Sequence, residues 1–171
     1  MSDVQIIRAT PDHVPAVRAM VQAAYAKYVD RIGRPPAPML ADYDKILEEG
    51  EQEVWVLTVP QSGVGAMLPS SSSSTTTAGS IILAPDPSCV AALKINNLVV
   101  DPKSQGKGYG RVLMEFAEEL ARTRGLKKLT LFTNVMMWEN IGLYAKLGFA
   151  EVGRRDEDGY ERVYFEKSLG S

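Results

Sequence analysis

Apolar and polar positions in the first fifty residues are spaced as expected for one strand followed by two helices. Residues 4–9 form a short apolar run that is typical of a strand. The Thr-Pro-Asp sequence at residues 10–12 then supplies an N-cap hydroxyl, a proline for the first helical position and an acid for the first turn. Apolar residues follow on one stripe at helical spacing, and we expect this helix to reach about Val29.

A proline-rich segment separates this helix from the next elements. Residues 31–39 contain three prolines, and this density predicts an extended connection without helix. A second helix is expected over residues 40–49, ending at Gly50, because glycine is the preferred residue just after a helix. Residues 54–59 then have the pattern of a strand.

Residues 60–79 break the compositional pattern. Five consecutive serines are followed there by three threonines, a tract that cannot bury a hydrophobic core. We predict that residues 60–79 form a flexible hairpin insertion between the strand at 54–59 and a short strand at 80–83. The length of 171 residues is usual for one domain, so a single domain over residues 1–171 is expected.

The hydrophobic pattern is more regular after residue 90. A strand over residues 90–100 leads into a glycine-rich loop and then into an amphipathic helix that ends at Gly125. Further along, we expect a strand, a short helix and two final strands, at about residues 129–133, 138–148, 149–155 and 160–167. The whole chain is therefore predicted to be a mixed α/β domain built on a sheet.

Composition excludes several classes of function. No apolar run approaches the roughly 20 residues of a membrane span, and the N-terminus lacks the features of a secretion signal, which predicts a cytoplasmic protein. The net charge of −2 and the lack of a basic block argue against nucleic acid as a partner. Cys89 is the only cysteine and His13 the only histidine, so we expect no disulfide and no metal centre.

The loop at residues 105–110, Gln-Gly-Lys-Gly-Tyr-Gly, lies between an apolar strand and a helix. This placement gathers free backbone N–H groups at the positive end of the helix dipole, and glycines let the backbone approach a phosphate closely. The loop lacks the Gly-Lys-Ser/Thr of Walker-type nucleotide loops and the third glycine of the dinucleotide fingerprint. A plain tight turn and another type of nucleotide-phosphate site are the alternatives.

Three motifs in this order resemble those of the GNAT superfamily of N-acetyltransferases. Gln105, Gly108 and Gly110 match its pyrophosphate-loop pattern Gln/Arg-x-x-Gly-x-Gly/Ala, and residues 97–102 and 140–149 resemble the motifs on either side. The resemblance implies an acetyl-CoA-dependent N-acetyltransferase. It also implies a mixed, mostly antiparallel sheet of about six to seven strands, flanked by about four helices and split between the fourth and fifth strands.

The resemblance assigns residues to acetyl-CoA as well. These are Leu98, Val99, Val100, Gln105, Gly106, Lys107, Gly108, Tyr109, Gly110, Arg111, Asn134 and Asn140. A backbone N–H near Leu98 or Val99 is expected to polarise the thioester carbonyl. Asn140 departs from the family pattern, which often has an asparagine where this chain has Met137. Asn134 is alternatively the N-cap of the next helix.

The strand before the loop changes the side on which its apolar residues lie. Leu93 and Ile95 share one parity, and Leu98 and Val100 take the other, with two asparagines between them. A β-bulge explains this shift, and a strand end that is buried on both faces explains it equally well. The resemblance favours the bulge, because in that family the strand diverges from its neighbour and the pantetheine arm enters the gap.

Tyr144 is the candidate catalytic residue. By resemblance it stands where the family has its general acid, and a phenol is a suitable proton donor to a leaving thiolate. The residues alone are also explained if Tyr144 only packs at the helix edge. No general base is assigned, since Glu139 and Asp101 are suggested by position alone.

The acceptor is expected to be a small amine or an amino-acid-like molecule. In the family, the first two helices and their connection choose the acceptor, and we assign Tyr28, Arg31 and Asn97 to it; arginines beside aromatic residues suit a carboxylate. The alternatives are a protein lysine or N-terminal acetyltransferase and a non-catalytic acyl-CoA sensor. Dimers are common in the family, and a homodimer is compatible with the sequence.

Overall fold

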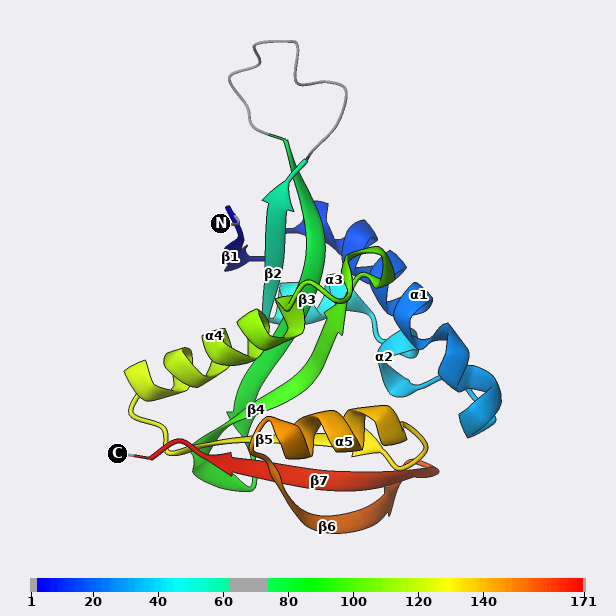
Figure 1. The fold of residues 1–171 in the computed structure, drawn as a ribbon, viewed down its shortest axis with the longest axis vertical. Helices are drawn as coiled ribbons and strands as arrows, with labels where there is room; N and C mark the ends of the chain where they lie inside the picture. The colour runs from blue at the N-terminus through cyan, green and yellow to red at the C-terminus, as the bar shows by residue number, and fades with distance from the viewer. Residues whose placement is uncertain (1–2, 62–73, 171) are drawn as a thin grey trace.

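The computed structural model describes residues 3–61 and 74–170, which form one seven-stranded sheet with helices on both faces (Figure 1). The strand order is β1-β2-β3-β4-β5-β7-β6, and only β4 and β5 pair in parallel. The strands are β1 Gln5–Arg8, β2 Glu53–Pro60, β3 Thr75–Asp86, β4 Cys89–Val100, β5 Lys128–Asn134, β6 Ala150–Glu157 and β7 Tyr160–Ser168. The helices are α1 Val14–Ile32, α2 Ala37–Leu40, α3 Tyr43–Glu49, α4 Tyr109–Thr123 and α5 Trp138–Lys146. The predicted mixed, mostly antiparallel fold is confirmed.

The proline-rich segment is the first place where the prediction was wrong. Residues 37–40 form the short helix α2, with Pro36 before it and Pro38 in its first turn. Proline is tolerated there because the first N–H groups of a helix have no partner inside the helix. Helix α2 is the one helix more than the predicted four.

The predicted helix over residues 40–49 is in fact two elements. Ala41 is extended and interrupts the helical path between α2 and α3. Asp42 then caps α3, because its carboxylate accepts a hydrogen bond of 3.1 Å from the backbone N–H of Lys45. The predicted end at Gly50 is confirmed, with a left-handed backbone at that glycine.

The threonine tract was also assigned wrongly. Residues 75–79, predicted as loop, belong to strand β3, where Thr75, Thr76 and Thr77 pair with residues 60, 59 and 58 of β2. Threonine is β-branched and fits a pleated strand, so a low-complexity composition does not exclude regular structure here. The rest of the predicted insertion, residues 62–73, lies outside the described residues.

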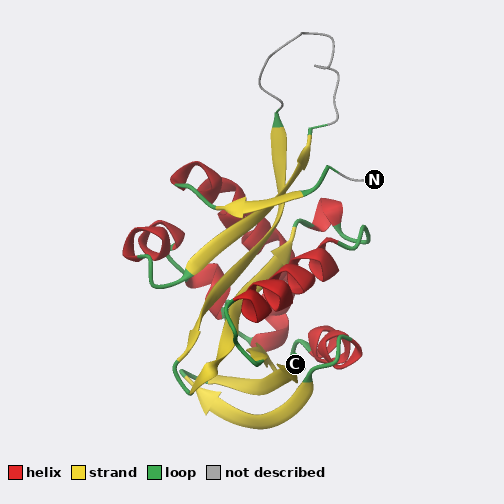
Figure 2. Ribbon diagram, turned by 90° about the vertical axis from the view of Figure 1, so that its left-hand side faces the viewer, coloured by secondary structure: helices red, strands yellow, loops and turns green. Residues whose placement is uncertain are grey.

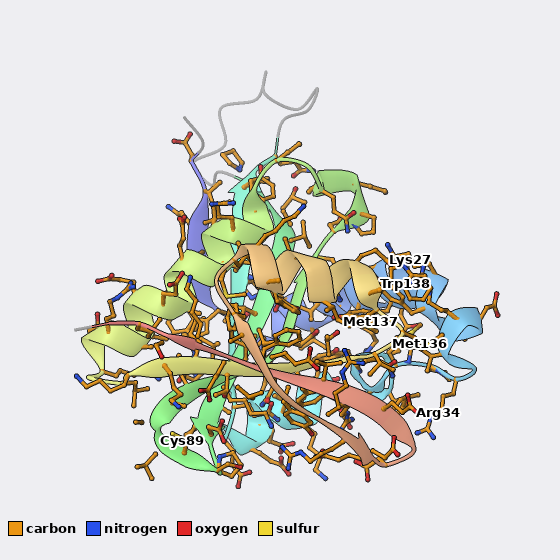
Figure 3. The ribbon with its side chains drawn as sticks, turned by 60° about the horizontal axis from the view of Figure 1, so that its bottom comes forward. Lys27, Arg34, Cys89, Met136, Met137 and Trp138 are labelled. Atoms are coloured by element: carbon orange, nitrogen blue, oxygen red, sulfur yellow. The ribbon has the colours of Figure 1, made fainter. Side chains whose placement is uncertain are left out.

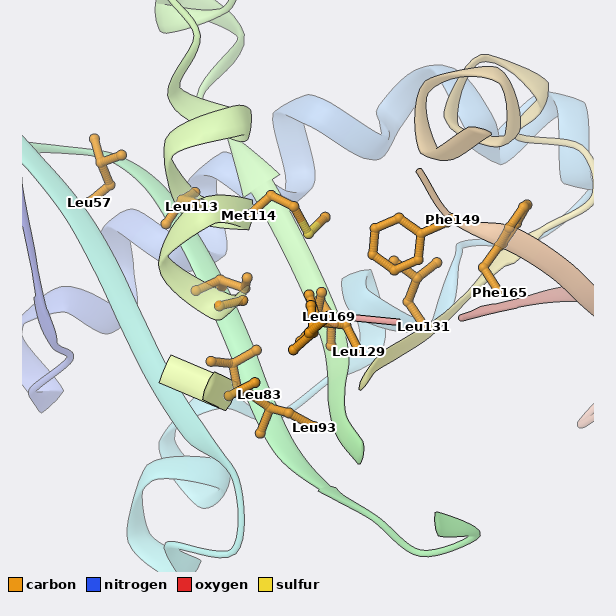
Figure 4. Packing of buried hydrophobic residues seen from close by; sticks show 14 of the residues in the cluster. Leu57, Leu83, Leu93, Leu113, Met114, Leu129, Leu131, Phe149, Phe165 and Leu169 are labelled. Atoms are coloured by element: carbon orange, nitrogen blue, oxygen red, sulfur yellow. The ribbon is translucent and has the colours of Figure 1, made fainter. Parts of the chain in front are cut away.

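Two hydrophobic clusters hold the helices to opposite faces of the sheet (Figures 1 and 2). The alternation of side chains along β3 shows the division: Ile81 and Leu83 pack with α4, and Ile82 packs with α1 and α3. Figure 4 shows the first cluster, in which Leu113 of α4 lies over the sheet. Helix α5 joins this same side through partly buried apolar residues.

Strands β4 and β5 are paired over only part of their length. Ala92 to Ile95 pair with β5, whereas the end of β4 pairs only with β3. A bulge marks the change, because Ile82 faces Asn97 and Leu83 faces Ile95, so that Asn96 is the extra residue. The bulge and the predicted split between the fourth and fifth strands are thus confirmed. No helix among residues 3–61 and 74–170 has the length and apolarity that crossing a membrane requires.

Candidate active site

A groove of about 650 Å³ lies at the split, between α1, the end of β4, the glycine loop and the exposed side of α5. Most of the residues assigned to the cofactor line it: Leu98, Val99, Val100, Gln105, Gly106, Gly108, Tyr109, Gly110 and Asn140. Lys107 and Arg111 are exposed and do not line the groove. The backbone of the loop therefore faces the groove, whereas these two charged side chains do not line it.

The glycine loop leaves backbone donors open toward this groove. Gly106 and Gly108 adopt positive φ values of 85° and 83°, a conformation that glycine reaches without steric cost. Gly108 is the N-cap of α4 and has no capping side chain, so the N–H groups of the first turn have no partner inside the helix. The loop therefore presents unpaired donors at the positive end of a helix dipole, as an anion site requires.

Gly110 is different from the other two glycines. Its backbone does not require glycine, and a Cβ atom added to it would meet only Val100 Cγ2 at 3.8 Å and Leu98 Cδ2 at 4.0 Å, which are ordinary contacts. The packing of the protein itself therefore leaves room for a side chain at position 110. The missing side chain keeps the groove open between the loop and β4.

The far side of the split holds a second space, which we name the acceptor cavity. It consists of two adjoining cavities of about 60 and 190 Å³, which share a wall made by the proline segment, the bulge and β5. The shared residues are Ala37, Pro38, Asn96, Asn97 and Phe132. Tyr25, Leu98 and Asn140 line both this cavity and the groove, so the two spaces meet at the split.

Tyr144 of α5 lines the acceptor cavity beside the split. Its ring packs against Phe149 and Phe165, with ring centroids 5.9 and 5.8 Å apart. Burial raises the pKa of Tyr144 to about 12, with a smaller contribution from Tyr28. At neutral pH the side chain is therefore a protonated phenol, which is the form that a proton donor needs.

Tyr25 of α1 faces the same region from the opposite wall. Its hydroxyl donates a hydrogen bond of 2.8 Å to Asn97 Oδ1. Burial raises the pKa of Tyr25 far above its usual value, and Tyr144 is the next contributor. Asn97, predicted to bind the acceptor, therefore lines the cavity while its side-chain oxygen accepts a hydrogen bond from Tyr25.

A bridge of charged and aromatic side chains joins α1 to α5 at the outer end of the groove. Glu139 accepts hydrogen bonds from Arg31 at 2.6 Å and from Tyr28 at 3.2 Å. Arg31 also donates to the carbonyl of Met136 and stacks over Trp138 at 3.7 Å. Figure 3 shows Trp138 beside Lys27 at this end of the molecule, with Cys89 at the opposite end.

This bridge bears on the predicted role of Arg31 and on Glu139, which position alone suggested as a base. Desolvation alone would raise the pKa of Glu139, but the hydrogen bonds that its carboxylate accepts and the charge of Arg31 together outweigh this effect. They hold that pKa below its usual range, which makes Glu139 a weak base. Arg31 is already paired with a carboxylate, so its charge is not free for an acceptor. Asp101 is also engaged, since it accepts a hydrogen bond from the N–H of Lys103.

Two asparagines and the histidine have local partners. Asn134 Oδ1 accepts a hydrogen bond of 2.9 Å from the N–H of Met136, so it stabilises the turn before α5 and also lines the acceptor cavity. Asn140 lies between the groove and the cavity, with its amide 3.7 Å from Met137 Sδ. His13 lies at the start of α1, where Nδ1 accepts from the N–H of Thr10.

Sequence reasoning missed three side chains of the acceptor cavity: Phe132, Tyr160 and Arg162. They come from β5 and β7, which the sheet order places next to each other although about thirty residues separate them. The pairing of Phe132 with Tyr164 and of Asn134 with Arg162 sets their positions. No local motif marks these residues, because only the register of β7 directs them to the cavity.

Comparison with known proteins agrees with this architecture. Residues 27–149 match the Acetyltransferase (GNAT) family. The chain is 40% identical over 60 residues to "IAA acetyltransferase" of Azospirillum brasilense, covering 35% of this chain and 39% of that protein. It is 41% identical over 61 residues to "Streptothricin acetyltransferase" of Streptomyces lavendulae, covering 36% of this chain and 32% of that protein. These matches span less than half the length of either relative.

The fold is also that of a solved acetyltransferase. The structure of the ribosomal-protein-S18-alanine N-acetyltransferase from Escherichia coli superposes with a TM-score of 0.66 at 20% identity, covering 98% of this chain and 95% of that one. At this identity the similarity shows the fold alone. Together with the family match over residues 27–149, it shows that this chain belongs to the GNAT family of acetyltransferases.

Proposed function

We propose that this protein transfers the acetyl group of acetyl-CoA to the primary amine of a small molecule, by direct attack while both substrates are bound. The observation that carries the proposal is the meeting of the groove and the acceptor cavity at the split, with Tyr144 beside the junction. A donor and an acceptor that enter from opposite sides can meet only at this point. Acetyl-CoA, the donor used by this family, supplies an acetyl group activated as a thioester.

The groove fits such a donor. The unpaired N–H groups of the glycine loop suit the pyrophosphate, and the open space at Gly110 lets it approach the backbone. Past the bulge, one side of β4 from Leu98 to Val100 has no strand partner, so its backbone groups are available to an extended pantetheine arm. A backbone N–H of this stretch would hold the thioester carbonyl.

Tyr144 is proposed to be the general acid. Its phenol keeps its proton at neutral pH, and it can give that proton to the departing thiolate sulfur and regain one from solvent. Tyr25 of α1 lines both the groove and the acceptor cavity. Its hydrogen bond to Asn97 holds α1 against the bulge of β4.

The amine is proposed to lose its proton to water. Among the described residues, no aspartate, glutamate or histidine lines the acceptor cavity. The rate below the pKa of the amine should therefore rise about tenfold per pH unit, and its midpoint should shift when an amine of different pKa is used. A fixed midpoint near neutral pH for all amines would instead indicate a titrating group of the protein.

The test is release of free CoA thiol from acetyl-CoA with a panel of amines. The panel holds amino acids, aromatic amines, spermidine, peptides with free lysine or N-termini, and streptothricin, which is suggested by the name of one relative. Turnover of small amines is expected. Turnover confined to peptides would make the protein a protein acetyltransferase. Tight binding of acetyl-CoA without thiol release for any amine would make it an acyl-CoA sensor.

A further inference from the structure

The lining of the acceptor cavity carries a positive charge and no negative one among the described residues. Its lining is formed by aromatic, apolar and neutral polar side chains, and Arg162 of β7 is the only charged residue among them in the described part of the chain. Phe132, Tyr160, Tyr144 and Tyr25 supply the aromatic surface. A cavity of this kind has no carboxylate to neutralise a cationic group of a substrate.

Arg162 is largely removed from solvent, with 11% of its side chain exposed. Its guanidinium lies 4.4 Å from the ring centroid of Phe132 and 5.5 Å from that of Tyr160. Among the described residues, Glu157 Oε2 accepts the one hydrogen bond that this guanidinium donates, at 3.1 Å. An arginine has five N–H donors, so one such bond leaves most of them without a protein partner.

Glu157 does not serve Arg162 alone. Its carboxylate also lies 3.7 Å from Arg155. The nearby hydroxyl of Tyr164, followed by the guanidinium of Arg162, holds the pKa of Glu157 below its usual range. One negative charge is therefore shared by two arginines.

Other charged side chains nearby do not neutralise the positive charge that Glu157 leaves uncompensated. Arg34 stacks on Tyr160 at 3.8 Å and donates a hydrogen bond to the backbone carbonyl of Asp158, not to a carboxylate. Asp156, Asp158 and Glu161 belong to the β6–β7 hairpin but not to the lining of the acceptor cavity. The wall of the cavity near Arg162 is therefore cationic and partly desolvated, where charge interactions are stronger than in bulk water.

We propose that the acceptor is an amine that also carries an anionic group, with a carboxylate as the simplest case, on an aromatic or flat apolar body. The inference rests on the proposed acetyl transfer and specifies its substrate. Arg162 binds the anion through its fork of donors, because a guanidinium matches a carboxylate in geometry as well as charge. Phe132 and Tyr160 hold the body of the acceptor, and the amine points toward Tyr144 at the split.

The same site disfavours polycationic acceptors. A second positive group near Arg162 would be repelled without a carboxylate in the lining to offset the repulsion. Spermidine and streptothricin are therefore expected to be poor substrates.

The test compares acceptors that differ only in charge. L-phenylalanine, L-tryptophan and 4-aminobenzoate are each paired with the corresponding amide, and thiol release is measured with each rate referred to the concentration of neutral amine. We expect kcat/KM to be higher for the acid than for its amide by about tenfold to a hundredfold in at least one pair. Amides or spermidine used as well as the acids by the wild-type protein would overturn the proposal.

The variant Arg162→Gln assigns the effect to this side chain. It should raise KM for the acid and leave kcat/KM for the amide nearly unchanged, so that the preference disappears, and Arg162→Lys should keep part of it. Arg155→Gln is the matched control, because Arg155 shares Glu157 but does not line the cavity, and it should keep the full preference. Unchanged affinity for acetyl-CoA shows that each variant is folded.

The outcomes separate this inference from the proposed function. Thiol release with neutral or cationic amines but with none of the acids refutes the anionic acceptor and leaves acetyl transfer standing. A preference for acids that survives in Arg162→Gln refutes the role of Arg162. Absence of thiol release with every amine refutes both proposals.

Discussion

The two sides of the split are constructed in different ways. On the groove side, the end of β4, the glycine loop and the start of α4 are one continuous stretch of chain, and its unpaired groups are backbone N–H donors. On the cavity side, the walls come from α1, the proline segment, β4, β5 and β7, and side chains form the lining. A continuous backbone suits one unchanging donor, whereas separate segments can each change to suit a new acceptor.

The largest effect is expected when the phenolic hydroxyl of Tyr144 is removed, beside the junction of the groove and the acceptor cavity. Tyr144→Phe deletes only the phenolic oxygen, and we expect kcat to fall by roughly a hundredfold to ten-thousandfold, the usual range for a lost general acid. The affinity for acetyl-CoA, measured by calorimetry, should stay the same because Tyr144 does not line the groove.

Tyr164→Phe is the control for this substitution, since Tyr164 lines neither the groove nor the acceptor cavity. It should keep nearly full activity. Equal losses in the two variants would mean that Tyr144 contributes packing and not proton transfer.

The groove side can be tested at two glycines. Gly110 leaves open space beside β4, whereas the backbone of Gly108 has a conformation that favours glycine. Gly110→Leu places a branched side chain at the groove, where the family pattern has glycine or alanine, and it should weaken acetyl-CoA binding about tenfold, or about 1.4 kcal/mol. Gly108→Ala should lower the free energy of unfolding by about 1 kcal/mol, because position 108 has a φ of 83°. Calorimetry and urea unfolding measure the two effects, and normal affinity in Gly110→Leu would exclude the loop as the anion site.

The smallest expected effect concerns the bridge between α1 and α5. Glu139→Gln removes the ion pairs with Arg31 and Lys27, which are partly exposed, so it should lower the free energy of unfolding by about 0.5 kcal/mol at pH 7. The folded-state pKa of Glu139 lies below its unfolded value, so this stabilisation is present above the unfolded pKa and is lost as pH falls through the folded one. Urea unfolding should therefore show the variant and the wild type converging at acid pH.

The contrast between a groove built from one continuous stretch and a cavity built from separate segments also explains which parts of the site the sequence could predict. The glycine loop, the bulge and Tyr144 lie within about fifty consecutive residues. Local turn geometry and side-chain alternation indicate the loop and a shift along the strand, whereas Tyr144 was singled out by the resemblance to the family. The phase shift at Asn96 and Asn97 was equally compatible with a strand buried on both faces, and the pairing of β3 with β4 decided for the bulge.

The side chains that line the acceptor cavity could not be predicted from local patterns in the sequence. Arg31 was a reasonable candidate for an acceptor carboxylate until the docking of α1 against α5 brought it to Glu139. Arg162 has no local signal, since it reaches the cavity only through the pairing of β7 with β5 and β6. The low-complexity composition of residues 60–79 predicted an irregular insertion, but Thr75, Thr76 and Thr77 extend strand β3.

The central claim is that donor and acceptor meet at the split in a ternary complex. Initial rates of thiol release, measured while both acetyl-CoA and the preferred amine are varied, test it most directly. Intersecting double-reciprocal lines are predicted, together with no acetylated protein by mass spectrometry after incubation with acetyl-CoA alone. Parallel lines and a covalent acetyl group on the protein that the amine then removes would contradict the account.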